Sequence, residues 1–136
     1  MVTVELSGAS DGEAPVLRRI PELLYGIGNF IENSVDFAVS RVVVEGRWDR
    51  TNIYVRVIDD GPGFTSDILS KIGEPYVTTR SGTPGQGGLG LGVFIAKTMI
   101  EKSGGVVRFD NAPALGGAVV AIRWPRKRVE APPALG

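Results

Sequence analysis

The chain has 136 residues, of which 43% are apolar and 22% charged, values typical of one globular domain with a hydrophobic core. Its 15 basic and 15 acidic residues cancel, which argues against bulk electrostatic binding to nucleic acid or anionic lipid. There is no Cys and no His, so disulfides, thiolate metal sites, Cys nucleophiles and His-based triads are excluded within this chain. Any bound metal would be a hard cation with oxygen ligands, such as Mg2+.

The hydrophobic pattern predicts an α+β fold with a mostly antiparallel sheet and helices on one face. In chain order, the expected elements are a strand at 2–6, a helix at 21–38, strands at 42–44 and 51–58 joined by a hairpin turn, a short helix at 65–72, a helix at 90–102, and strands at 105–110 and 117–124. The end of the chain, with Pro132-Pro133, is expected to be disordered.

The helix expected at 21–38 carries a polar stripe. At about 100° per residue, Asn29, Asn33 and Asp36 fall within a sector of about 60°. Two amides and a carboxylate in one stripe could hold a hydrated Mg2+ or a polar ligand. A stripe that faces water is the alternative, although Asn is a poor choice for an exposed helix surface.

An acidic turn, Asp59-Asp60-Gly61-Pro62-Gly63, directly follows an apolar strand. An acid at a strand end can accept a hydrogen bond from an exocyclic amine, and neighbouring glycines let a flat ring approach the backbone. Taken alone, the same residues also make an ordinary turn.

Glycine fills more than half of the positions from Gly82 to Gly92, and a helix is expected to begin within this stretch. Free N–H groups and the positive end of a helix favour an anion such as phosphate. The run is neither a Rossmann fingerprint, because it comes late in the chain, nor a Walker A loop, because Lys97-Thr98 lies inside the helix. The irregular residues 73–88 before it are typical of a functional lid or a disordered loop.

An Asn-bearing helix, a D-x-G-x-G turn after a strand and G-x-G-x-G at a helix start follow one another in this sequence. In this order they resemble the ATP-binding catalytic domain of sensor histidine kinases, in the GHKL superfamily. The segments that resemble the N, G1, F and G2 boxes lie at 29–38, 60–64, 73–80 and 88–97. The likeness continues to a closing hairpin near the end of the chain. Within the boxes, the segments V-D-F-A, G-E-P-Y-V-T-T-R and G-V-F-I-A-K are similar to those of the redox-responsive RegB-type kinases.

The resemblance implies the two-layer α/β sandwich of this superfamily (the Bergerat fold), with about three helices on one face of a mixed sheet. It places ATP and Mg2+ between the Asn helix and a mobile lid at 73–87. Asn33 would coordinate Mg2+, with Asn29 supporting the metal or the phosphates. Asp60 would receive the adenine amino group, and Arg80 would contact the γ-phosphate. The nucleotide-binding positions implied in this way are Asn29, Asn33, Asp36, Phe37, Asp60, Gly61, Gly63, Ile72, Tyr76, Thr79, Gly88, Leu89, Gly90, Leu91 and Gly92.

By the same resemblance, residues 1–127 form the catalytic and ATP-binding domain of a two-component kinase, and 128–136 form a disordered tail. The γ-phosphate would pass to a histidine on a separate dimerisation domain and then to a response regulator. Because this chain has no His, we expect that it cannot phosphorylate itself on His. The domain would belong to the cytoplasmic portion of a membrane-anchored kinase, without a nucleic-acid partner.

Two alternatives remain open from the sequence. A GHKL-type ATPase such as DNA gyrase would carry a general-base Glu at the position of Asn29, which cannot take a proton. The second alternative is a degenerate, non-enzymatic docking module. Its motivation is that relatives often carry Lys or Arg at the position of Asp36 and Thr or Ser at that of Ala118.

Overall fold

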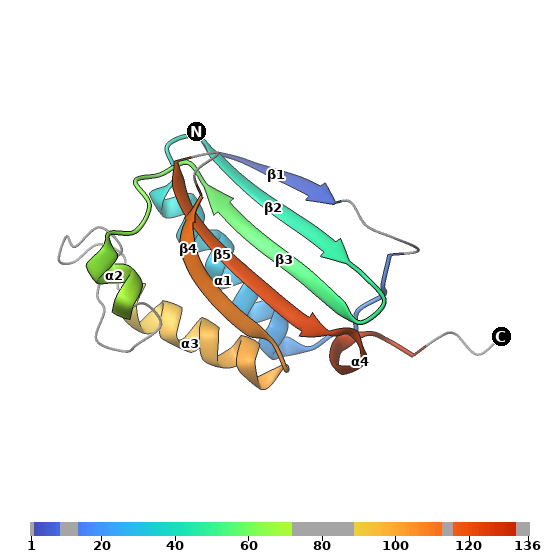
Figure 1. Cartoon of the computed structure of the whole chain (residues 1–136). Helices are drawn as coiled ribbons and strands as arrows, with labels where there is room; N and C mark the ends of the chain where they lie inside the picture. Colours follow the sequence, from blue (N-terminus) through green and yellow to red (C-terminus); the bar gives the residue numbers. More distant parts are fainter. Residues whose placement is uncertain (1, 9–13, 72–88, 113–115, 133–136) are drawn as a thin grey trace.

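The computed structural model describes residues 2–8, 14–71, 89–112 and 116–132, which form a sheet layer and a helix layer (Figure 1). The strands are β1 (Thr3–Gly8), β2 (Arg41–Trp48), β3 (Asn52–Asp59), β4 (Val106–Ala112) and β5 (Gly117–Pro125). The helices are α1 (Pro21–Phe37), α2 (Ser66–Lys71), α3 (Leu89–Lys102) and α4 (Arg126–Val129). The elements predicted from the sequence all appear, in the predicted order.

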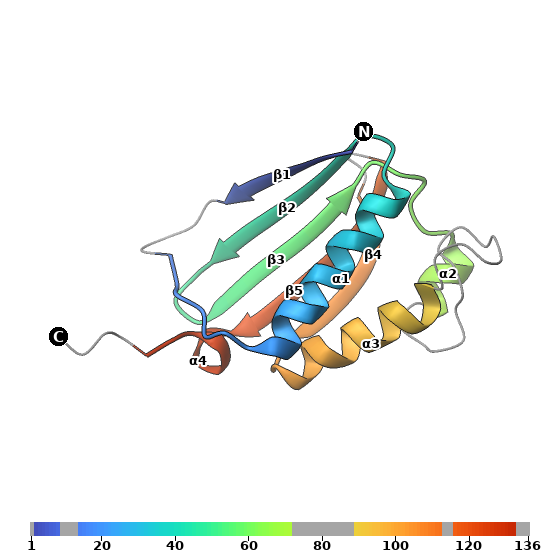
Figure 2. The same cartoon turned by 180° about the vertical axis from the view of Figure 1, so that it is seen from behind.

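The sheet is mixed and mostly antiparallel, as predicted, with strand order β1-β2-β3-β5-β4. Its one parallel pair among the described strands is β1 with β2, and α1 supplies the crossover that a parallel pair requires. The other neighbours pair antiparallel. Figure 2 shows α1 and α3 across one face of the sheet, with α2 beyond the edge at β4.

The hydrophobic core lies between these two long helices and the sheet. Its largest fully buried apolar side chains are Trp124, Phe30, Leu23, Ile100, Val42, Val57 and Val129. The indole of Trp124 brings one polar group into this core, and its Nε1 donates to Ser103 Oγ at 2.8 Å. Ser103 Oγ in turn donates to the carbonyl oxygen of Ile100 at 2.5 Å, so the indole N–H and the serine hydroxyl both have an acceptor in the core.

A glycine lets α1 and α3 cross closely. A Cβ on Gly26 would lie 2.6 Å from Ile100 Cδ1 and 3.1 Å from the carbonyl oxygen of Ala96. Both of these α3 residues are fully buried, so neither side can move away easily. Gly28, two positions further along α1, is exposed and has open space where its Cβ would be.

The carboxylate of Asp60 holds the loop between α1 and β2. Its Oδ1 accepts main-chain N–H groups from Val39 at 2.8 Å, Ser40 at 3.0 Å and Arg41 at 3.1 Å. Its Oδ2 accepts the Ser40 hydroxyl at 2.8 Å. The main-chain N–H of Ser40, followed by that of Arg41, holds the pKa of Asp60 well below its usual range.

The tail expected to be disordered from residue 128 includes residues that pack. Arg126–Val129 forms α4, and the Val129 side chain is fully buried. Main-chain hydrogen bonds join Arg18 N to the Val129 carbonyl at 2.8 Å and Ala131 N to the Val16 carbonyl at 2.6 Å. The described packing therefore extends past residue 128, while residues 133–136 lie outside the described part of the chain. Among the described residues, no helix is long and apolar enough to cross a membrane.

Substituting the two glycines of α1 should have opposite effects. Gly28→Ala should stabilise the fold by up to about 1 kcal/mol, because alanine favours the helix and meets no atom. Gly26→Ala should destabilise it by about 1–3 kcal/mol, because its methyl group overpacks the helix crossing. Urea unfolding of both variants measures this difference. Equal effects at both positions would contradict the close crossing.

Asp60 should stabilise the fold in a pH-dependent way. Because its pKa is lower in the folded state than the unfolded value of about 3.9, its contribution is full well above about pH 4 and is lost as the pH falls further. Asp60→Asn removes this contribution, so the melting temperatures of wild type and variant should differ at pH 7 and converge towards pH 2. A difference that stays constant over this range would contradict the role of the carboxylate.

Candidate functional site

The polar stripe of α1 runs into the protein rather than along a solvent face. Asn33 is only 5% exposed and Asn29 is half-buried, whereas Asp36, one turn further, is exposed. The side-chain oxygen of Asn33 is buried and has no hydrogen-bond partner among the described residues. A buried, unpartnered amide oxygen is costly unless a ligand or water occupies it, and it is a ligand type that Mg2+ accepts.

The first turn of α3 lies next to this stripe. A Cβ on Gly92 would be 3.8 Å from Asn29 Oδ1, an ordinary van der Waals distance. Leu89, Gly90 and Leu91 form the preceding residues of the same turn, so the helix begins within the glycine run as predicted. The first N–H groups of a helix have no intrahelical acceptor and favour an anion. The structure thus brings a candidate phosphate site to Asn29.

Asp59, the last residue of β3, is fully buried at the other end of this region. Its Oδ1 accepts main-chain N–H groups from Gly61 at 2.9 Å and Ala118 at 3.2 Å. A Cβ on Gly117 would lie 2.0 Å from the Asp59 carbonyl oxygen, so only glycine fits there. Two strands and the acidic turn therefore meet around one buried carboxyl group.

Gly61 joins this carboxyl group to α1. A Cβ on Gly61 would lie 2.2 Å from the carbonyl oxygen of Phe37, so a side chain there would clash with the end of the helix. Phe37, Gly61 and Asp59 consequently lie together, one turn beyond Asn33 along α1. The close contact at Gly61 explains one of the two turn glycines of the predicted G1 box.

The second turn glycine, Gly63, adopts a left-handed conformation with φ of 75°. It lies against Asn111 of β4, whose side-chain amide clasps the next residue: Phe64 N donates to Asn111 Oδ1 at 2.7 Å, and Asn111 Nδ2 donates to the Phe64 carbonyl at 3.0 Å. Phe64 also meets Phe109 edge-to-face, with ring centroids 6.3 Å apart. The acidic turn is thereby fixed to the sheet.

The structure separates the two neighbouring acids of the turn. Asp60, the residue expected to receive an adenine amine, is engaged by the loop at 39–41 through both carboxylate oxygens. Asp59, which is not among the nucleotide-binding positions implied by the resemblance, is the acid that lies among Gly61, Gly117 and Ala118. The D-x-G-x-G pattern could have pointed to Asp59, because the Asp that lies two residues before Gly61 and four before Gly63 is Asp59.

Five of the expected site residues lie outside the described part of the chain: Ile72, Tyr76, Thr79, Arg80 and Gly88. Within the described part, Asn29, Asn33 and Gly92 lie on the facing helices, and Phe37, Gly61 and Gly63 belong to the acidic-turn region. Asp36 is on the same helix, but its side chain is exposed.

Comparison with known proteins identifies the family and the fold of this chain. The family model described as histidine kinase-, DNA gyrase B-, and HSP90-like ATPase matches residues 20–128. The sensor histidine kinase RegB of Cereibacter sphaeroides is 40% identical over 139 aligned residues, which cover 90% of this chain and 30% of RegB. The chain therefore spans less than a third of the length of that relative.

Two solved structures share the fold. Full-length ShkA in complex with AMPPNP has a TM-score of 0.69 at 22% identity, covering 96% of this chain and 27% of that one. Histidine kinase ThkA in complex with the response regulator TrrA has a TM-score of 0.69 at 20% identity, covering 92% and 35%. With the family model matched over most of its length, this chain belongs to the histidine kinase-, DNA gyrase B- and HSP90-like ATPase family and is homologous to the catalytic domains of sensor histidine kinases.

Proposed function

We propose that this chain binds ATP with Mg2+ and passes the γ-phosphate to a histidine on a separate domain, from which a response regulator receives it. The observation that carries the proposal is the buried side-chain oxygen of Asn33, which has no hydrogen-bond partner among the described residues. It lies one turn of α1 beyond Asn29, which faces the glycine-rich start of α3. The identity with RegB favours a kinase, and the ShkA and ThkA structures contain an ATP analogue and a response regulator respectively. As in membrane-anchored sensor kinases, the domain would work on the cytoplasmic side.

At the adenine end, we assign the amine-accepting role to Asp59 instead of Asp60. Gly61 N and Ala118 N orient the Asp59 carboxyl group, which would accept a hydrogen bond from the exocyclic amine. Gly61 and Gly117 keep side chains away from it. Asp60 has a positioning role, because the five hydrogen bonds that its carboxylate accepts from residues 39–41 hold the segment between α1 and β2.

At the phosphate end, Asn33 would supply an oxygen ligand to Mg2+, and Asn29 would support the phosphates opposite the start of α3. Only one protein oxygen is needed, because Mg2+ usually keeps several waters and binds phosphate oxygens as well. Bound Mg2+ would neutralise charge on the transferring phosphoryl group. Asp36, Phe37, Gly90 and the five positions outside the described residues stay as predicted nucleotide contacts.

The residues favour phosphoryl transfer over hydrolysis. A hydrolase needs a base to activate water, and the amide of Asn29 cannot accept that proton. The chain itself has no His to phosphorylate, so the acceptor must lie on another domain. A nucleotide-free docking module is less well supported, because Ala118 keeps its main-chain donor to Asp59 although it lacks a hydroxyl.

The two acids of the turn should differ in their effect on nucleotide affinity. Asp59→Asn should weaken binding of a non-hydrolysable ATP analogue at least about tenfold, because one charge-assisted hydrogen bond is worth about 1.5–3 kcal/mol. Asp60→Asn serves as the matched control and should leave the affinity nearly unchanged at pH 7 while lowering stability. Calorimetric titration measures both. Loss of affinity in Asp60→Asn alone would reverse the assignment.

The chain should phosphorylate only in trans. With ATP and Mg2+, it should transfer an acid-labile, base-stable phosphate to a histidine-containing dimerisation domain supplied as a separate protein, and gain none itself. Asn33→Ala should abolish the transfer without lowering stability much, since its oxygen makes no hydrogen bond to the described chain. Asn52→Ala, at the first residue of β3, is the control. Rapid ATP hydrolysis without any acceptor would favour the ATPase instead.

A further inference from the structure

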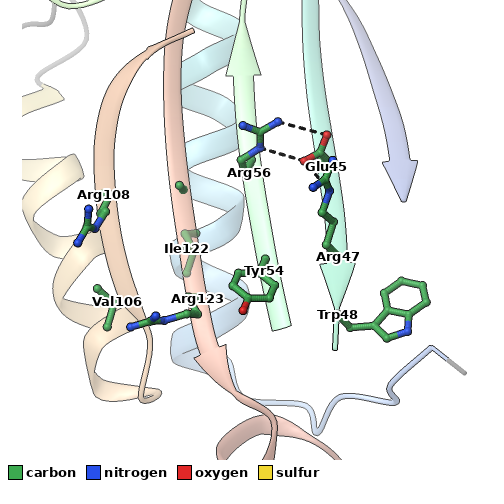
Figure 3. A pocket seen from close by; sticks show the side chains of 10 residues that line it. Glu45, Arg47, Trp48, Tyr54, Arg56, Val106, Arg108, Ile122 and Arg123 are labelled. Atoms are coloured by element: carbon green, nitrogen blue, oxygen red, sulfur yellow. Dashed lines mark hydrogen bonds and ion pairs between the residues drawn. The ribbon is translucent and has the colours of Figure 1, made fainter. Parts of the chain in front are cut away.

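The face of the sheet opposite α1 and α3 carries a hollow of about 580 Å³ (Figure 3). Figures 1 and 2 show no described helix over this face. Two ladder rows build the hollow across β2, β3, β5 and β4: Arg47, Tyr54, Arg123 and Val106 in one, and Glu45, Arg56, Ala121 and Arg108 in the other. The nucleotide site lies on the other side of the sheet.

This hollow is strongly basic in a chain whose net charge is zero. Four arginines line it, and Glu45 is the single acid among its lining residues. Glu45 is already paired: Arg56 Nε lies 2.9 Å from its Oε1, and Arg47 Nε lies 3.4 Å from the same oxygen. The lining residues therefore carry more positive than negative charge, and no further acid among them balances the other arginines.

Of the four arginines that line the hollow, Arg108 and Arg123 are exposed and have no ion-pair partner among the described residues. They are diagonal neighbours on β4 and β5, so their charges repel each other. An acid placed between them would remove this repulsion and gain two charge-assisted hydrogen bonds. These two arginines therefore favour a binding partner with negative charge at this position.

The floor between the arginines is apolar. Ala121 separates Arg56 from Arg108 in its row, and its small side chain creates the depression. Val106, beside it, is 48% exposed. An aliphatic side chain of an occupant would cover both, with carboxylates reaching the arginines on either side.

We propose that this face docks an acidic segment of a partner protein, with carboxylates that flank an aliphatic side chain. Arginine and aromatic residues without lysine line the hollow, which is the composition of protein interfaces. A small ligand fits less well, because all four arginines and half-exposed Val106 stand in solvent and cannot enclose it. Nucleic acid fits less well, because Glu45 lies within the basic rows.

Binding of a defined peptide tests the proposal. The probe is a fluorescein-labelled ten-residue peptide with four glutamates flanking two leucines, measured by anisotropy with this chain. Arg108→Glu with Arg123→Glu should weaken binding at least tenfold, whereas Lys102→Glu with Lys127→Glu, the same charge change elsewhere, should not. Ala121→Phe, which fills the hollow without changing charge, should also weaken it. Amide chemical shifts should change in β4 and β5.

Several results would overturn the proposal. They are failure of the peptide to bind, equal weakening by both double variants, tighter binding of a single-stranded oligonucleotide of the same charge, and self-association that the arginine reversal abolishes. Affinity for the ATP analogue should be unchanged in the arginine variant, which shows that it is folded. The docking face and the nucleotide site can thus fail independently.

Discussion

The burial of the Asp59 carboxyl group is the constraint around which the two layers meet. A carboxyl group placed in the interior must be satisfied, and the main-chain N–H groups of Gly61 and Ala118 do this from the turn and from β5. To come so close, Gly61 must lie against the end of α1 and Gly117 against the Asp59 carbonyl, so both positions exclude a side chain. One buried acid thereby fixes the relative positions of β3, β5 and α1.

The packing of the two long helices likewise depends on glycines, which leave room for a close approach. Gly26 allows α1 and α3 to approach at one end of their crossing, and Gly92 lies against Asn29 at the other. Immediately after these contacts, α1 places Phe30 in the core and then Asn33, which is almost fully buried. The core residue and the polar residue differ by one turn of helix, so the same packing that stabilises the fold buries the candidate metal ligand.

The two faces of the sheet have different chemistry. The face under α1 and α3 supports the polar and glycine-rich site, whereas the opposite face carries arginines around Ala121. Because side chains alternate along a strand, each strand contributes to both faces without conflict. Val107 and Ile122 fill the core while Arg108 and Arg123 stand on the other side. A nucleotide and a protein partner could therefore be bound by the same sheet at once.

Hydrophobic periodicity and the turn residues determined the elements and their order, since these are local properties of the chain. The resemblance to the family came from the motifs and the order in which they follow one another. They also placed Asn29, Asn33 and Asp36 in one stripe of α1. Which of these are buried depends on α3, which crosses from a distant part of the sequence, and so only the tertiary structure could decide it. The same holds for the adjacent acids at 59 and 60. The sequence offers both, but the carboxyl group of one is enclosed by β5 and the other is held by the loop before β2. The basic face was equally hidden, because its four arginines lie on four different strands and become neighbours only through the pairing of those strands.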